Sequence, residues 1–157
     1  MTTRAASGLV LASIGAVLAS ACARPAPSYT PRIRKVAITM VPLLVQEQRK
    51  LFPFLDSAFA KGGVLEGKEV YAFSPSTVTV VEGDTIHFTL INPEDDQHSF
   101  VLPDTAVSLP GLTTTRMTYV ATRAGVYPIL CAVAAHLPMM SGQLVVLAPA
   151  AVGGRGP

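Results

Sequence analysis

Alternating apolar and polar positions predict short β-strands in the second half of the chain. On both sides of the turn at 82–84, valine, isoleucine, phenylalanine and leucine alternate with threonine and with His87. A period of two places alternate side chains on one face of a sheet, so we expect a hairpin here with one buried face. Further strands are expected at 99–102, 113–121, 125–131 and 143–147. Short strands separated by turn signals are typical of an all-β sandwich.

The pattern before this region predicts one more strand and a helix. Residues 36–45 form an apolar, β-branched run, in which Pro42 marks an edge or a strand end. Residues 46–60 carry apolar side chains at helical spacing and are followed by two glycines. We expect a short helix at about 46–60, kinked or restarted at Pro53. The predicted domain spans 35–148, with a core at 66–148.

The first 22 residues have the features of an export signal. A positive start at Arg4 precedes an apolar run at 8–18, which is too short to remain as a membrane span, and small residues follow. Ala19-Ser20-Ala21 is a good cleavage site, and residues 18–22 resemble a bacterial lipoprotein box in which Leu18 lies one position too early. Both readings leave Cys22 as the first mature residue.

Cysteine usage separates the two readings. The chain has two cysteines, Cys22 and Cys131. Lipidation explains Cys22, whereas an unmodified exported thiol has no evident use. The alternatives are that Cys22 is incidental or forms a disulfide with Cys131. We favour lipidation, with the proline-rich segment 23–34 as a tether and 149–157 as a flexible tail. This predicts a protein in the periplasm or at the outer face of the cytoplasmic membrane.

Composition narrows the classes of partner. The chain of 157 residues has 12 basic and 10 acidic side chains, with 14% charged residues. It therefore has room for one ordinary domain, and it has no electrostatic footprint for nucleic acid.

Three side chains near the end of the chain have the chemistry of a metal site. Cys131, His136 and Met140 lie close enough in sequence for one loop to carry a thiolate, an imidazole and a thioether. With a second histidine, this set suits copper in a trigonal site with a weak axial methionine. His98 is preferred over His87, because His87 shares a face with the threonines and is expected to meet solvent.

The axial position has two candidates, and the acidic turn has two interpretations. Met139 and Met140 are adjacent and point in different directions, so both are candidates. The acidic residues at 94–96 either dock a cationic partner or form a solvated turn, which is the more common role. Each candidate ligand taken alone is also typical of an ordinary sandwich core.

Residues 70–147 resemble the cupredoxins. The matching elements are Phe73-Ser74-Pro75, Glu82-Gly83-Asp84-Thr85, Asn92 leading to His98, Gly125 and Tyr127 leading to Cys131, and Met140-Ser141-Gly142. The loop spacing is similar to azurin, and the His98 region is similar to the copper domain of cytochrome oxidase subunit II. The resemblance implies a Greek-key β-sandwich that binds copper through His98, Cys131, His136 and Met140. With one cysteine in this region, it implies a single copper ion rather than a binuclear centre.

The resemblance also implies a function. We expect a monomer that transfers single electrons between redox proteins, such as cytochromes or a terminal oxidase. The ring edge of His136 is expected to reach a partner through the apolar rim at 137–139. Catalysis is not expected, because copper oxidases and nitrite reductases need more histidines than three. The alternative is a periplasmic copper-delivery or oxidase-assembly protein, and a metal-free scaffold is a third reading.

Overall fold

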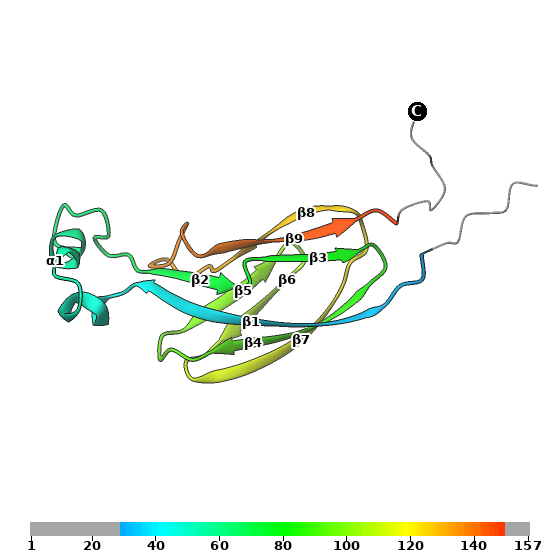
Figure 1. The fold of residues 1–157 in the computed structure, drawn as a ribbon, viewed down its shortest axis with the longest axis horizontal. Coiled ribbons are helices and arrows are strands. Elements are labelled where there is room, and N and C mark those ends of the chain that lie inside the picture. Colours follow the sequence, from blue (N-terminus) through cyan, green and yellow to red (C-terminus); the bar gives the residue numbers. More distant parts are fainter. Residues whose placement is uncertain (1–28, 150–157) are drawn as a thin grey trace, which may run out of the picture.

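The computed structural model describes residues 29–149, which form a β-sandwich with a small helical insertion (Figure 1). Its elements are β1 (Ile33–Leu44), η1 (Gln46–Lys50), α1 (Phe54–Phe59), β2 (Val70–Ser74), β3 (Thr77–Val81), β4 (Thr85–Asn92), β5 (His98–Leu102), β6 (Thr105–Leu109), β7 (Thr113–Val120), β8 (Gly125–Leu130) and β9 (Ser141–Leu147).

Two sheets pack face to face around one core. One sheet has the order β2-β1-β4-β7, and the other has the order β3-β9-β8-β5-β6. The pairs β1 with β4 and β3 with β9 are parallel, and the remaining pairs are antiparallel. Alternate residues of each strand enter the core, for example Ile86, Phe88 and Leu90 of β4. Some neighbours, such as β5 and β6, are consecutive strands, whereas others, such as β3 and β9, are distant in sequence, as expected for a sandwich with crossover connections.

The predicted hairpin around residues 82–84 is wrong, although its alternation is right. Strand β3 pairs with β9, while β4 pairs with β1 and β7 in the other sheet. The turn therefore carries the chain from one sheet to the other. Asp84 explains this path, because its buried carboxylate accepts hydrogen bonds from the backbone nitrogens of Arg32 and Val81 and from the Arg34 side chain. These bonds hold the turn against the start of β1.

Strand β1 begins at Ile33, so its first two residues lie within the predicted tether at 23–34. The strand pairs with two neighbouring strands along its length. Residues Ile33–Thr39 pair in parallel with β4, and Thr39–Leu44 pair with β2. Pro42 lies in the second part, beyond the pairing with β4, so its missing N–H removes no bond to that strand. The register with β2 shifts between Pro42 and Leu44.

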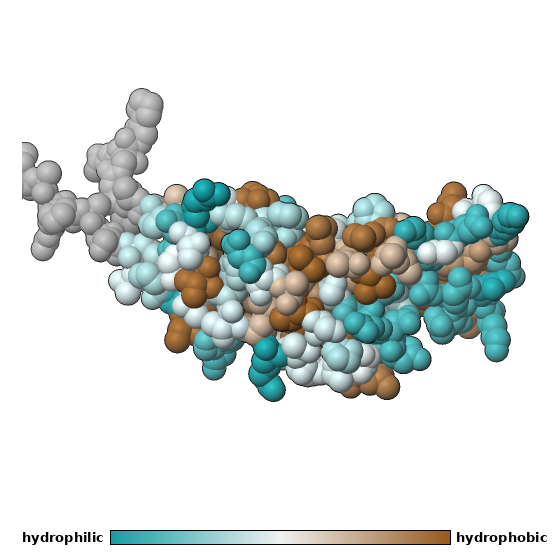
Figure 2. Space-filling model, turned by 180° about the vertical axis from the view of Figure 1, so that it is seen from behind, coloured by the Kyte–Doolittle hydropathy of each residue, from teal (hydrophilic) through white to brown (hydrophobic). Residues whose placement is uncertain are grey.

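The predicted helix at about 46–60 forms two short helices rather than one. The 3-10 helix η1 ends at Lys50, and α1 begins after Pro53, where proline is favoured. A small apolar cluster of Leu55, Phe59 and Leu65 holds this insertion together. Figure 1 places the insertion at the opposite end of the sandwich from the start of β1. Seen from behind in Figure 2, the insertion end is largely hydrophilic, whereas hydrophobic side chains are interspersed over the sandwich.

Several sequence predictions fall outside the described residues. They concern the export signal, Cys22, the first half of the proline-rich tether, and residues 150–157 of the tail. Within residues 29–149, no helix has the length and apolar character needed to cross a membrane.

Candidate metal centre

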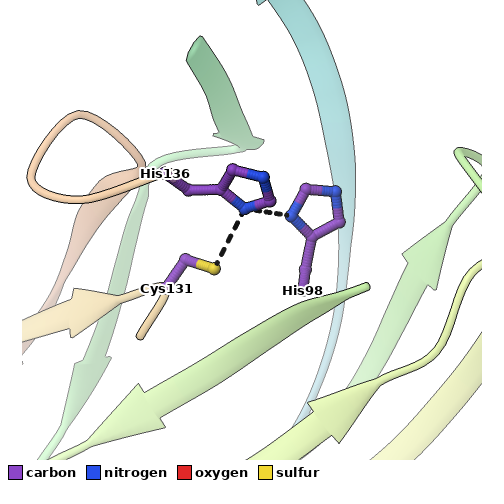
Figure 3. Close-up of side chains that lie close together, drawn as sticks. All are labelled: His98, Cys131 and His136. Atoms are coloured by element: carbon purple, nitrogen blue, oxygen red, sulfur yellow. Dashed lines mark hydrogen bonds between the residues drawn. The ribbon is translucent and has the colours of Figure 1, made fainter. Parts of the chain in front are cut away.

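Three of the four predicted ligands converge at one end of the sandwich (Figure 3). The Nδ1 atoms of His98 and His136 lie 3.1 Å apart, and Cys131 Sγ lies 3.6 Å from Nδ1 of His136. All three residues are buried, with exposed fractions of 0% for His98 and Cys131 and 3% for His136. The rings and the thiol point toward one another from β5 and from the loop that follows β8.

The turn before His98 is fixed by one buried amide. The Asn92 side chain donates to the backbone oxygens of Asp96 at 2.7 Å, Pro110 at 3.1 Å and Leu109 at 3.2 Å. Gly111 packs against the same turn so closely that an added Cβ would lie 2.1 Å from the Asp95 oxygen. His98 therefore enters β5 from a turn with little freedom.

The loop that carries the other ligands is closed on itself. The backbone nitrogen of Cys131 donates to the Met140 oxygen at 3.1 Å, and the nitrogen of Met140 donates to the His136 oxygen at 3.0 Å. The end of the insertion also holds this loop. Lys68 Nζ donates to the Ala134 oxygen at 2.7 Å, and the Glu69 nitrogen donates to the Ala135 oxygen at 3.0 Å. The loop and the insertion therefore share one end of the molecule.

Ser99 joins the first histidine strand to the cysteine loop. Its backbone nitrogen lies 3.4 Å from Cys131 Sγ, and its hydroxyl oxygen accepts from the Ala132 nitrogen at 2.7 Å. The hydroxyl also lies 3.8 Å from Cys131 Sγ. Serine at this position thus provides hydrogen bonds to the sulfur and fixes its surroundings, which is a role that tunes metal sites.

The alternatives for two of the ligands differ in burial. His87 is exposed on the outer face of β4, and it is not part of the His98, Cys131 and His136 group. Met140 is 0% exposed and packs in the core with Cys131, whereas Met139 is 37% exposed. Burial therefore favours His98 over His87 and Met140 over Met139 as metal ligands.

Both histidines are held toward their neutral form. Burial is the main cause that lowers the pKa of His98, and the nearby His136 adds to it, which brings the value to about 4. Burial likewise lowers the pKa of His136, and Asp96 opposes this shift. A neutral imidazole has a lone pair free for a metal.

The donor set fits a single metal ion. Typical metal bonds are about 2.0–2.1 Å to imidazole nitrogen and about 2.3 Å to thiolate sulfur, so donors of one ion lie about 3–4 Å apart. The separations of 3.1 and 3.6 Å fall in this range. Two imidazoles and a thiolate in one cluster, with the buried Met140 in the same core as Cys131, are the residue types of a trigonal copper site with an axial methionine. The residues present therefore fit a copper ion.

Two neighbours of the histidines, Tyr71 and Glu69, were not identified from the sequence, and the closeness of Asp96 to His136 was not expected. The buried Tyr71 ring lies 4.5 Å from the His98 ring and 4.7 Å from the His136 ring, measured between centroids. Glu69, Asp96 and His136 have potential ligand atoms within 4.8 Å of one another. His136 is only 3% exposed, and the expected approach of a partner to its ring edge through the rim 137–139 stays a prediction. No local pattern indicates these contacts, because Tyr71 and His136 are far apart in sequence.

Comparisons with solved structures identify the fold. The chain is similar to the multicopper oxidase mgLAC (TM-score 0.52, 15% identity, covering 80% of this chain and 40% of that one). It is also similar to copper nitrite reductase from Nitrosomonas europaea (TM-score 0.50, 22% identity, 74% and 42%). A third likeness is auracyanin A, a "blue" copper protein from Chloroflexus aurantiacus (TM-score 0.44, 19% identity, 73% and 98%).

The chain spans about two fifths of the oxidase and reductase chains that it matches. No protein-family model matches its sequence, and no curated protein does. The two-sheet topology, the histidine and cysteine group and the likeness to copper proteins of known structure agree with one another. This protein has the cupredoxin fold.

Proposed function

We propose that this protein binds one copper ion through His98, Cys131 and His136, with Met140 as the axial ligand, and carries single electrons between redox proteins. The observation that carries the proposal is the convergence of two Nδ1 atoms and one thiol sulfur within a buried cluster. When bound in such a site, copper supplies a one-electron couple.

The chain's own contribution is a rigid set of donors. Electron transfer is fast when the two oxidation states need little rearrangement of their ligands. Asn92 fixes the turn before His98, Ser99 ties β5 to the cysteine loop, and the Cys131 to Met140 backbone bond closes that loop. These bonds keep the donors in place whichever oxidation state they hold.

A copper-delivery or oxidase-assembly role is the alternative, and burial argues against it. A delivery protein must release its ion to a partner, whereas His98 and Cys131 are 0% exposed. The test is to challenge the loaded, reduced protein with a moderate Cu(I) chelator and to cycle it between oxidised and reduced forms. A carrier retains its copper over repeated one-electron cycles. Rapid stripping of the ion would instead favour delivery.

We also propose a carrier rather than an enzyme. The chain has three histidines, of which the proposed site uses two. The third, His87, is exposed on the outer face of β4. A second copper centre of the kind that reduces nitrite or oxygen needs more imidazole ligands than the one that remains in this chain.

Export and a lipid anchor at Cys22 complete the proposed function. The sequence of residues 1–22 supports export, and a tether would restrict the search for redox partners to the membrane surface. Strand β1 begins at the opposite end of the sandwich from the loop between β8 and β9 (Figure 1), which suits a partner that approaches from the side away from the anchor. Expression in a bacterium that processes lipoproteins, followed by mass measurement and fractionation, tests this part. Loss of membrane association in Cys22→Ala is expected, and an unmodified Cys22 in the native chain would contradict it.

A further inference from the structure

Tyr71 packs against both candidate histidine ligands from the opposite sheet. Its ring meets His98 edge-on, at an interplanar angle of 73°, and meets His136 at 57°. The residue is 2% exposed, so the ring has no freedom to move away into solvent. Tyr71 is thus the one aromatic side chain recorded against both imidazole rings among the described residues. Its contact restricts the orientation of both rings together.

The Tyr71 hydroxyl reaches the acidic turn beside the site. It donates to Oδ2 of Asp96 at 2.5 Å, and the backbone oxygen of Asp96 accepts from the Asn92 side chain at 2.7 Å. Asp96 is therefore held through both its side chain and its backbone. It is half-buried, unlike its exposed neighbour Asp95. An ordinary solvated turn would not fix an acidic side chain in this way.

Asp96 and Glu69 bring carboxylate charge next to His136. Their carboxylate oxygens and a ring nitrogen of His136 lie within 4.8 Å of one another. Glu69 is held by the Gln46 backbone nitrogen at 3.0 Å. Burial is the main cause that raises the pKa of Glu69, and the nearby Asp96 charge adds to it. Two acidic groups thus adjoin one ligand of the proposed metal.

We propose that Tyr71 and Asp96 act as a positioning pair: the Tyr71 ring fixes the planes of His98 and His136, and its hydroxyl holds the Asp96 carboxylate where it lowers the reduction potential of the bound copper. This inference rests on the proposed function. A fixed negative charge near the ion favours the more positive, oxidised state, and the effect is strong where solvent screens poorly. Outer-shell groups of this kind orient ligands and tune the metal.

The first experiment compares Asp96→Asn with Asp95→Asn in the copper-loaded protein. Both substitutions remove one negative charge, but Asp95 is exposed and is screened by solvent and salt. The proposal predicts that Asp96→Asn raises the potential by about 59 mV or more, which is a tenfold change in the ratio of oxidised to reduced protein for one electron. Asp95→Asn should change it far less. Equal shifts in the two variants would overturn the role of Asp96.

A double-mutant cycle tests whether Tyr71 acts through Asp96. Tyr71→Phe keeps the ring and removes only the hydroxyl that donates to Asp96. The proposal predicts that Tyr71→Phe changes the potential in the native background and has little further effect in Asp96→Asn, since coupled residues give non-additive effects. Additive shifts in the reduction potential would show that the two residues act independently. This result would overturn the proposal that Tyr71 acts through Asp96.

Ring positioning is tested without copper, which separates it from the proposed function. In the metal-free protein, nuclear Overhauser contacts from the Tyr71 ring to both histidine rings are expected, and Tyr71→Phe should retain them. In Tyr71→Leu, the chemical shifts of both rings should change. Absence of the contacts in the native chain, or unchanged shifts in a folded Tyr71→Leu, would overturn the positioning role even if copper binds. Failure of the native chain to bind copper, with these contacts present, would count against the proposed function and would remove the tuning role of Asp96.

Discussion

The backbone nitrogen of Ser99 lies 3.4 Å from Cys131 Sγ, so the strand that presents His98 also donates a hydrogen bond to the sulfur. Ser99 lies in β5, and Cys131 directly follows β8, which neighbours β5 in the same sheet. The distance between the first histidine and the cysteine is therefore set by sheet geometry rather than by a flexible loop.

Removal of the Ser99 hydroxyl should loosen this connection. In Ser99→Ala, the Ala132 nitrogen loses its acceptor, and the contact from the hydroxyl to the sulfur is lost as well. We expect a cost of about 1 kcal/mol in the free energy of unfolding. We also expect a lower reduction potential, because fewer donors to a thiolate favour the oxidised metal. Voltammetry and denaturant unfolding measure both quantities.

Ser108→Ala is the matched control for this substitution. Ser108 faces Ser99 across the β5 and β6 pair, but it is exposed, and its hydroxyl oxygen accepts from the exposed Gln97 side chain. The reduction potential of Ser108→Ala should equal that of the native chain. A potential in Ser99→Ala that is equal to the control would contradict the role given to the hydroxyl.

The two histidine candidates outside the loop should differ in copper affinity. His98→Ala removes a buried ring nitrogen from the cluster, whereas His87→Ala removes an exposed ring from the outer face of β4. Titration with copper should show a large loss of affinity in His98→Ala and native affinity in His87→Ala. Weakened binding in His87→Ala would mean that the wrong histidine has been chosen.

The two methionines should differ in their effect on the potential. Met140→Leu conserves volume in the core and removes the thioether, so we expect a folded protein with a cost below about 1.5 kcal/mol. Its reduction potential should rise, because the oxidised ion loses a weak axial donor. Met139 is 37% exposed, and Met139→Leu should leave the potential unchanged. A shift confined to Met139→Leu would reverse the assignment.

Asp84 should make stability depend on pH in a defined direction. Burial raises the pKa of Asp84, but hydrogen bonds from Tyr29, Arg34 and two backbone nitrogens lower it more, to well below its usual range. A depressed pKa stabilises the fold fully above the unfolded value of about 3.9, and this contribution is lost as the pH falls through the folded pKa. Asp84→Asn should cost about 2–3 kcal/mol at neutral pH.

The difference in unfolding free energy between Asp84→Asn and the native chain should therefore narrow below about pH 4. Asp56→Asn is the control, because Asp56 forms an exposed ion pair with Arg49 at 2.7 Å and such pairs contribute little. A constant difference from neutral pH down to pH 3, measured by denaturant unfolding, would contradict the account of Asp84.

Much of the sandwich was predictable, since alternation identifies strands and their buried faces. Strand β5 begins at His98, one residue before the predicted start, and the break in the helix falls at Pro53. The pairing of β3 with β9 was not predictable, because alternation says which face is buried and not which strand lies alongside. Strand β6 was also missed, although its five residues lie between two recognised strands.

In the candidate site, too, local spacing could be predicted from the sequence and long-range contacts could not. The order of Cys131, His136 and Met140 in one loop gives three ligands by local spacing, and few histidines remained for the fourth. Tyr71 reaches the site through the facing of two sheets, which no local pattern encodes. The acidic turn was read as solvated because nothing in its own sequence indicates that a tyrosine hydroxyl holds Asp96.

The most direct test of the copper site is the visible absorption spectrum of the oxidised protein after loading with copper, together with the copper content per chain. The account predicts one copper ion per chain and a strong visible band from thiolate-to-copper charge transfer. It also predicts loss of this band in Cys131→Ser and its retention in His87→Ala. A colourless oxidised protein, or an undiminished band in Cys131→Ser, would contradict it.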